Sequence, residues 1–202
     1  RGELKKAVAV PSKSILFNID QKATIISHDD FDAVLDVFAK VFDDFCGYYG
    51  NQGYVANFER ELDQAGLYQK FMEIFLQTTG QSWHEGREIF NINRQKIAHA
   101  YALATGNPEE SARDIIQSYR DDYKPSIDSF AEKVNAYIQT QPVGFRLNFF
   151  VDEVGQYIAE NIKLMTNLQT IAESLSTTCN GQAWLFVTSQ DDMSKVFGEL
   201  SD

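Results

Sequence analysis

Two short, largely apolar runs late in the chain are typical of neighbouring strands. One covers residues 146–151 and the other residues 183–188. Continuous runs of this length are expected for strands buried on both faces, as in a parallel sheet. Between them, residues 154–178 place apolar side chains three and four positions apart, which predicts a helix. The order strand, helix, strand predicts two adjacent parallel strands joined by a right-handed crossover.

A third strand is predicted near the start of the chain, over residues 14–19. We expect it to pair with the 146–151 strand on the side opposite to the 183–188 strand. Two polar residues, Asp20 and Gln21, follow it. They either approach the same edge of the sheet or simply close a loop.

The pattern over residues 28–140 predicts an almost wholly helical region. The first, over about 29–48, carries a strong apolar stripe and is ended by Gly47 and Gly50. Further helices are predicted over about 53–65, 67–78, 83–104, 108–121 and 126–140.

These elements together predict an α/β fold with a large all-α insert. Residues 1–27 and 141–202 are expected to form a partial parallel sheet of about three strands with its helices, and residues 28–140 a helical lobe. In the strand order 5-1-4-3-2, common among P-loop ATPases, the strands of this chain would be numbers 2, 3 and 4. Strands 1 and 5 of that order would be missing.

The 146–151 run ends abruptly in two acids, Asp152 and Glu153. Acids in this position lie at the carboxyl edge of a parallel sheet, where ligands bind in open α/β folds. The pattern is that of a Walker B motif. In that interpretation Asp152 holds Mg²⁺, usually through water, and Glu153 is the catalytic residue that polarises the attacking water. The alternative is that Asp152 only caps the helix that begins at Val154.

Polar residues also follow the 183–188 run. In nucleotide-hydrolysing ATPases a "sensor" side chain in this place touches the γ-phosphate or the water. Thr188, Ser189 and Gln190 are the candidates, and Ser189 or Gln190 fits best by reach. The alternative is that these residues form a turn before another helix.

Two long segments carry a resemblance to a known family. The stretch FRLNFFVDEVGQYIAENIKLMTNLQTIAESLSTTCNGQAWLFVTSQDDM resembles the large P-loop ATPase of BREX bacteriophage-resistance systems. The stretch KAVAVPSKSILFNIDQKATIIS, continued by DDFDAVLDVFAKVFDDFCGYYG, resembles an earlier part of the same proteins, so the resemblance covers nearly the whole chain. The most specific segment is VDEVGQYI with the NLQTIAESL helix that follows. The resemblance implies a large cytoplasmic ATPase of the AAA-like or STAND-like class that uses ATP and Mg²⁺. It implies other BREX defence proteins as partners, among them a DNA methyltransferase, with a homo-oligomer as a further option.

One feature of such ATPases is missing, because no G-x-x-x-x-G-K-[ST] occurs in the sequence. The nearest glycine-rich segment, residues 47–53, has no Lys-Ser/Thr and does not follow a predicted strand. Without the loop that cradles the phosphates, a normal triphosphate site cannot form. We therefore expect an internal fragment of a larger ATPase, with the loop upstream of residue 1, and we expect the isolated chain to be inactive.

Composition narrows the classes of partner. The net charge of −11 argues against broad nonspecific DNA binding, which needs lysine and arginine, so DNA contact is expected only indirectly or through other regions. No apolar stretch approaches the length of a membrane span. The two cysteines and three histidines show no metal-ligand spacing. The remaining alternative to the ATPase is a degenerate P-loop-like scaffold or protein-interaction domain without ATPase activity.

Overall fold

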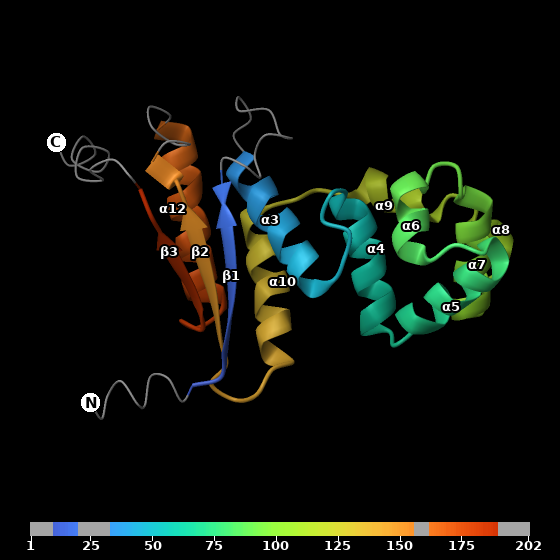
Figure 1. The fold of residues 1–202 in the computed structure, drawn as a ribbon, viewed down its shortest axis with the longest axis horizontal. Helices are drawn as coiled ribbons and strands as arrows, with labels where there is room; N and C mark the ends of the chain where they lie inside the picture. Colours follow the sequence, from blue (N-terminus) through green and yellow to red (C-terminus); the bar gives the residue numbers. More distant parts are fainter. Residues whose placement is uncertain (1–9, 20–32, 156–161, 190–202) are drawn as a thin grey trace. The chain divides into compact units, whose positions relative to one another are not determined.

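The computed structural model describes residues 10–19, 33–155 and 162–189 (Figure 1). The chain divides into two compact units, one made of residues 1–42 and 125–202 and the other of residues 43–124. The first unit contains a three-stranded parallel sheet and the second is helical. The predicted α/β class is therefore confirmed at this level. None of the helices among the described residues is long and apolar enough to cross a membrane.

The sheet has the strand order that the sequence predicts. Its strands are β1 (Ser12–Asn18), β2 (Arg146–Asp152) and β3 (Ala183–Val187), in the order β1-β2-β3. Both pairings are parallel, and the register sets Asn18 beside Asp152 and Val151 beside Val187. All three carboxyl ends therefore meet at one edge of the sheet.

Helices cover one face of this sheet. The covering helices are α3 (Ala33–Cys46), α10 (Ile127–Gln139) and α12 (Ile162–Thr178). Phe38 of α3 packs edge-on against Phe17, with ring centroids 5.3 Å apart, and Phe130 of α10 lies 6.2 Å from Phe149. α12 joins them through the Ser174 hydroxyl, which donates to Asp128 of α10 at 3.3 Å. Of the predicted helix over 154–178, residues 154–155 and Ile162–Thr178 are helical, and residues 156–161 lie outside the described part.

The opposite face is exposed, which corrects the expectation of strands buried on both faces. Leu16, Phe150, Trp184 and Phe186 alternate with the buried residues, and their exposed fractions are 73%, 38%, 47% and 41%. The topology gives the reason. The chain moves in one direction from β1 to β3, and right-handed crossovers then place every connecting helix on the same face. Among the described residues no helix covers the opposite face of the sheet.

The boundary between the two units differs from the predicted limits of 28 and 140. The first part of α3 and all of α10 belong to the sheet-bearing unit, so the separate helical unit spans only residues 43–124. The reason is the apolar face of each helix. Phe38 and Phe130 contact Phe149 of the central strand.

The second unit packs short helices around an aromatic core. Phe58, Phe71, Phe75, Trp83 and Ile97 are its fully buried large side chains. The elements are α4 (Gly53–Gln64), α5 (Tyr68–Thr79), α6 (Trp83–Gly86), η1 (Arg87–Ile89), α7 (Arg94–Thr105), α8 (Glu109–Ala112) and α9 (Ile115–Asp122).

The single helix expected over residues 83–104 is divided into α6, η1 and α7. Gly86 lies so close to Phe75 that an added Cβ would meet its ring at 2.4 Å. Asn93 then closes the intervening turn, because its side-chain amide donates to the Gly86 carbonyl at 3.1 Å. Core packing around Phe75 thus overrides the helical pattern.

Candidate functional site

The two predicted acids lie at the carboxyl edge of the sheet, as the last residue of β2 and the residue after it. Backbone bonds extend the pairing with the β3 segment past the strand ends. The Thr188 amide donates to the Val151 carbonyl at 2.9 Å, and the Val154 amide donates to the Thr188 carbonyl at 3.0 Å. This pairing holds the Asp152–Glu153 turn directly beside Thr188.

Asp152 joins β2 to the end of β3. Its Oδ1 accepts a hydrogen bond from the Thr188 hydroxyl and another, at 3.0 Å, from the backbone amide of Glu153. A helix cap would accept from an amide two or three residues further on, and neither of these two bonds is of that kind. The carboxylate is exposed at the edge. It is therefore oriented by Thr188 and open to a ligand.

Glu153 has an unusual backbone. Its φ is 60°, in the left-handed region that favours glycine and costs an ordinary residue about 1 kcal/mol. Its half-buried carboxylate accepts a hydrogen bond from the Asn18 side-chain amide, across the ends of β1 and β2. The left-handed turn thus directs Glu153 toward β1, while Asp152 faces β3.

Asn18 was not among the residues singled out from the sequence. The residues named there, Asp20 and Gln21, lie outside the described part of the chain. The signal for Asn18 was a polar residue near the end of the strand predicted over residues 14–19. Only the register, which sets Asn18 beside Asp152, shows that it reaches the two acids.

The predicted sensor residues are placed in part. Ser189 lies against the first helical turn after β2, because a Cβ added to Gly155 would stand 1.9 Å from the Ser189 Oγ. Gln190 lies outside the described residues. Thr188, which ranked behind Ser189 and Gln190 by reach, donates its hydroxyl to Asp152. The structure therefore brings together Asp152 and Thr188, and Glu153 and Asn18.

The oxygen atoms at this edge suit Mg²⁺ as part of a larger complex. Mg²⁺ prefers carboxylate, carbonyl and water oxygens, and one or two carboxylates usually hold it together with waters and phosphates. Asp152 supplies such a carboxylate. In the described part of the chain no group of three or more His, Cys, Asp or Glu side chains is arranged to hold a metal. The donor set thus fits a hydrated Mg²⁺ shared with a phosphate and does not form a closed protein cage.

The glycines of residues 47–53 have local structural roles. Gly47 follows α3 with a φ of 88°. Gly53 begins α4, and an added Cβ there would lie 2.0 Å from the Tyr123 hydroxyl. These glycines provide a turn and a close packing contact, and the segment does not follow a strand. The structure thus gives no phosphate loop to this segment.

Comparison with known protein families and solved structures does not assign a function to this chain. No model of a known protein family matches the chain. No solved structure matches it either.

Proposed function

We propose that this chain supplies the metal-binding and water-activating edge of a P-loop-type ATPase, with Asp152 as the Mg²⁺ ligand and Glu153 as the catalytic base. The observation that carries the proposal is the pair of acids at the carboxyl end of the central strand, bonded to both neighbouring strand ends by Asn18 and Thr188. Ligands of open parallel sheets bind at this edge. The left-handed backbone of Glu153 supports it, since such strain clusters at functional sites.

Each residue has a role that follows from its contacts. ATP and Mg²⁺, when bound, supply the reactive phosphoryl group and the charge that stabilises its transfer. Asp152, oriented by Thr188, would hold a water of the metal's hydration shell. Glu153 would accept a hydrogen bond from the attacking water. Because Asn18 bonds the same carboxylate, it fixes the orientation of Glu153 and competes with that water.

Two features of the sheet are consistent with a complete site in which an additional strand and helix carry the phosphate loop. Among the described residues no strand pairs with the outer edge of β3, and one face of the sheet is bare. A further parallel strand could pair with this outer edge of β3 and precede β1 in the chain. The connection from that strand to β1 would cross the sheet in the direction opposite to the path from β1 to β3. A right-handed crossover would therefore place the connecting helix on the bare face. The loop between that strand and helix would then lie at the same edge as Asp152.

The assignment to a BREX-type ATPase rests on the sequence resemblance. It adds cytoplasmic location, association with other defence proteins and homo-oligomeric assembly to the proposal. The sequence of a longer protein that contains this chain tests it first. A strand followed by G-x-x-x-x-G-K-[ST] before residue 1 supports the ATPase, and a longer sequence without one contradicts it.

ATP hydrolysis by such a longer protein tests the two roles separately. Glu153→Gln keeps the shape of the side chain and removes its charge, so nucleotide binding should persist while turnover falls roughly 10²-fold or more. Asp152→Ala should weaken Mg²⁺-dependent binding. Glu73→Gln, an exposed acid on α5, is the control and should turn over like the wild type. Wild-type turnover in both site variants would show that the two acids only shape the turn.

An interaction scaffold is the second candidate, and the exposed aromatic face favours it. The rings of Phe150 and Phe186 stack with centroids 4.6 Å apart, and Trp184 stacks on Phe186 at 6.1 Å. Because these rings lie face to face with one another, the row favours apolar contact with a partner protein over the stacking of nucleic-acid bases. Polar substitution of Phe186 would abolish such an interaction without affecting Mg²⁺ binding.

A further inference from the structure

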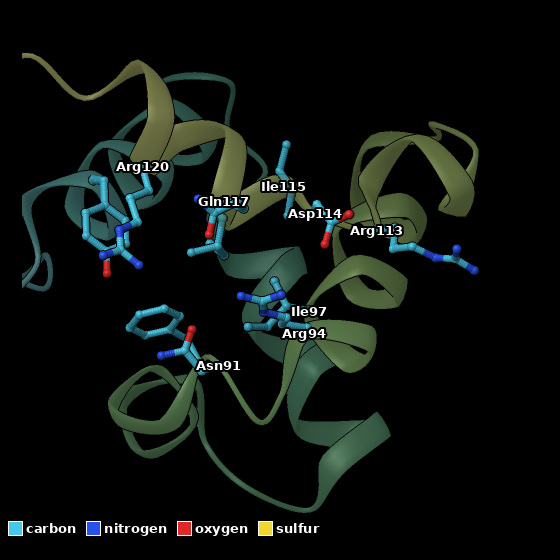
Figure 2. A pocket seen from close by; sticks show the side chains of 11 residues that line it. Asn91, Arg94, Ile97, Arg113, Asp114, Ile115, Gln117 and Arg120 are labelled. Carbon is cyan, nitrogen blue, oxygen red and sulfur yellow. The ribbon is translucent and has the colours of Figure 1, made fainter.

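The helical unit contains a hollow between α7 and α9 (Figure 2). Apolar side chains, among them Tyr54, Phe90 and Ile97, form part of its wall, and Asn91, Arg94 and Arg120 are among its polar lining. The hollow spans about 310 Å³ including its open mouth, and its inner part has room for about one water molecule. A group larger than one water molecule can therefore bind only at the open mouth of the hollow.

The hollow is positively charged in an otherwise acidic chain. Arg94, Arg113 and Arg120 line it with one carboxylate, Asp114, while the whole chain carries a net charge of −11. The other two arginines of this unit are paired, Arg60 with Asp43 and Arg87 with Glu59. Among the described residues none of the three arginines at the hollow forms an ion pair. Their charge is therefore available to a ligand.

Two of the three arginines are directed at the same space. Figure 2 shows Arg94 and Arg120 approaching the hollow from different helices, whereas Arg113 points away from it. Arg113 also lines a separate hollow with Glu109 and Glu110. The guanidinium of Arg120 lies 5.9 Å from the centre of the Tyr54 ring, a cation–π contact that holds it at the wall.

Two helix starts add to the positive field. α7 begins at Arg94 and α9 at Ile115, and the side chain of neither N-cap residue, Asn93 or Asp114, accepts a hydrogen bond from the helix that it precedes. Asn93 instead donates its amide to the Gly86 carbonyl. The first-turn amides of both helices thus lack a side-chain acceptor, and helix N-termini with this property favour anions.

We propose that the mouth of this hollow binds a phosphate group, held by Arg94 and Arg120 and by the amides at the start of α7, with Tyr54 and Phe90 beside it. Tyr54 and Phe90 meet edge to face at 5.8 Å and supply an apolar wall for an ester substituent. Planar guanidinium groups match the oxygens of a phosphate. The site is separate from the sheet edge and does not depend on its proposed function.

Inorganic phosphate, titrated at constant ionic strength into the ¹⁵N-labelled chain, tests the site. We expect saturable NMR shifts centred on residues 91–96 and 115–117. Phenyl phosphate should shift the same amides and bind more tightly, because its ring can contact Tyr54 and Phe90. No saturable shift with either probe, or shifts centred elsewhere, would overturn the proposal.

Charge variants separate direct contact from general attraction. Arg94→Gln and Arg120→Gln should each weaken phosphate binding at least about tenfold, the loss expected for a charge-assisted hydrogen bond. Arg113→Gln removes the same charge nearby. It should change the affinity for phosphate less than about threefold, because exposed charges are screened by salt. All three side chains are exposed, so the variants should keep the thermal midpoint of the wild type. Equal losses in all three variants would overturn direct contact.

Discussion

The side-chain amide of Asn18 donates a hydrogen bond to the carboxylate of Glu153, across the ends of two neighbouring parallel strands. The two residues are far apart in sequence and are brought together by the register that sets Asn18 beside Asp152. A bond to a charged acceptor of this kind contributes about 1.5–3 kcal/mol.

A double-mutant cycle should detect this bond. Asn18→Ala and Glu153→Ala should each lower the free energy of unfolding, and the double variant should lose less than their sum. The coupling should be about 1.5 kcal/mol, the lower end of the range for such a bond, because both side chains are half-buried. Urea denaturation measures all four proteins. Additive losses would mean that Asn18 does not orient Glu153 in solution.

The left-handed backbone at Glu153 should affect the free energy of unfolding of variants at this position. Glycine adopts this conformation without strain, so Glu153→Gly should be more stable to urea than Glu153→Ala by about 1 kcal/mol. Position 132, an exposed glutamate inside α10, is the matched control. There the order should reverse, because glycine weakens a helix interior by about 1 kcal/mol relative to alanine. The same order at both positions would contradict the strained turn.

Alkaline pH should destabilise the sheet-bearing unit through Cys179. Burial raises the pKa of this thiol from 9.0 to about 11. Because the pKa of the Cys179 thiol is higher in the folded state, the thiol of the unfolded chain loses its proton first as the pH rises. The contribution of Cys179 to stability is therefore complete below pH 9 and is lost as the pH rises to about 11. Urea midpoints across this range should fall less steeply for Cys179→Ala than for Cys46→Ala. Parallel slopes would contradict a buried thiol with a raised pKa.

Much of the sheet follows from the sequence, because polar residues bound each apolar run. The strand 146–151 is extended by only one residue at its end, to Asp152. Its exposed face was not predictable from the run itself. Phe150 and Phe186 are as apolar as their buried neighbours, and only the common direction of the two crossovers shows that one face lacks helices.

The two acids of the site were predictable from the sequence, but the residues that hydrogen-bond to them were not. Asp152 and Glu153 stand out because two charges follow an apolar run. Asn18 and Thr188 do not stand out, since a polar residue ends almost every strand. Their contacts depend on the strand register and on the left-handed turn at Glu153, and neither is visible in residue spacing.

The isolated chain should show no ATP turnover, because its sequence contains no phosphate loop. Calorimetry with ATP and Mg²⁺ should detect weak binding at most. Micromolar affinity would mean that other residues cradle the phosphates and that the missing loop is not needed.

The most direct test of the central claim is where a divalent metal binds on this chain. Mn²⁺ replaces Mg²⁺ at oxygen sites and broadens the NMR signals of nearby amides. Substoichiometric Mn²⁺ should first broaden residues 152–154, together with residues 18 and 188 at the neighbouring strand ends, and Asp152→Asn should abolish this effect while Glu73→Gln leaves it intact. Broadening that spreads over the acidic surface, or that persists in Asp152→Asn, would contradict a metal-binding edge at β2.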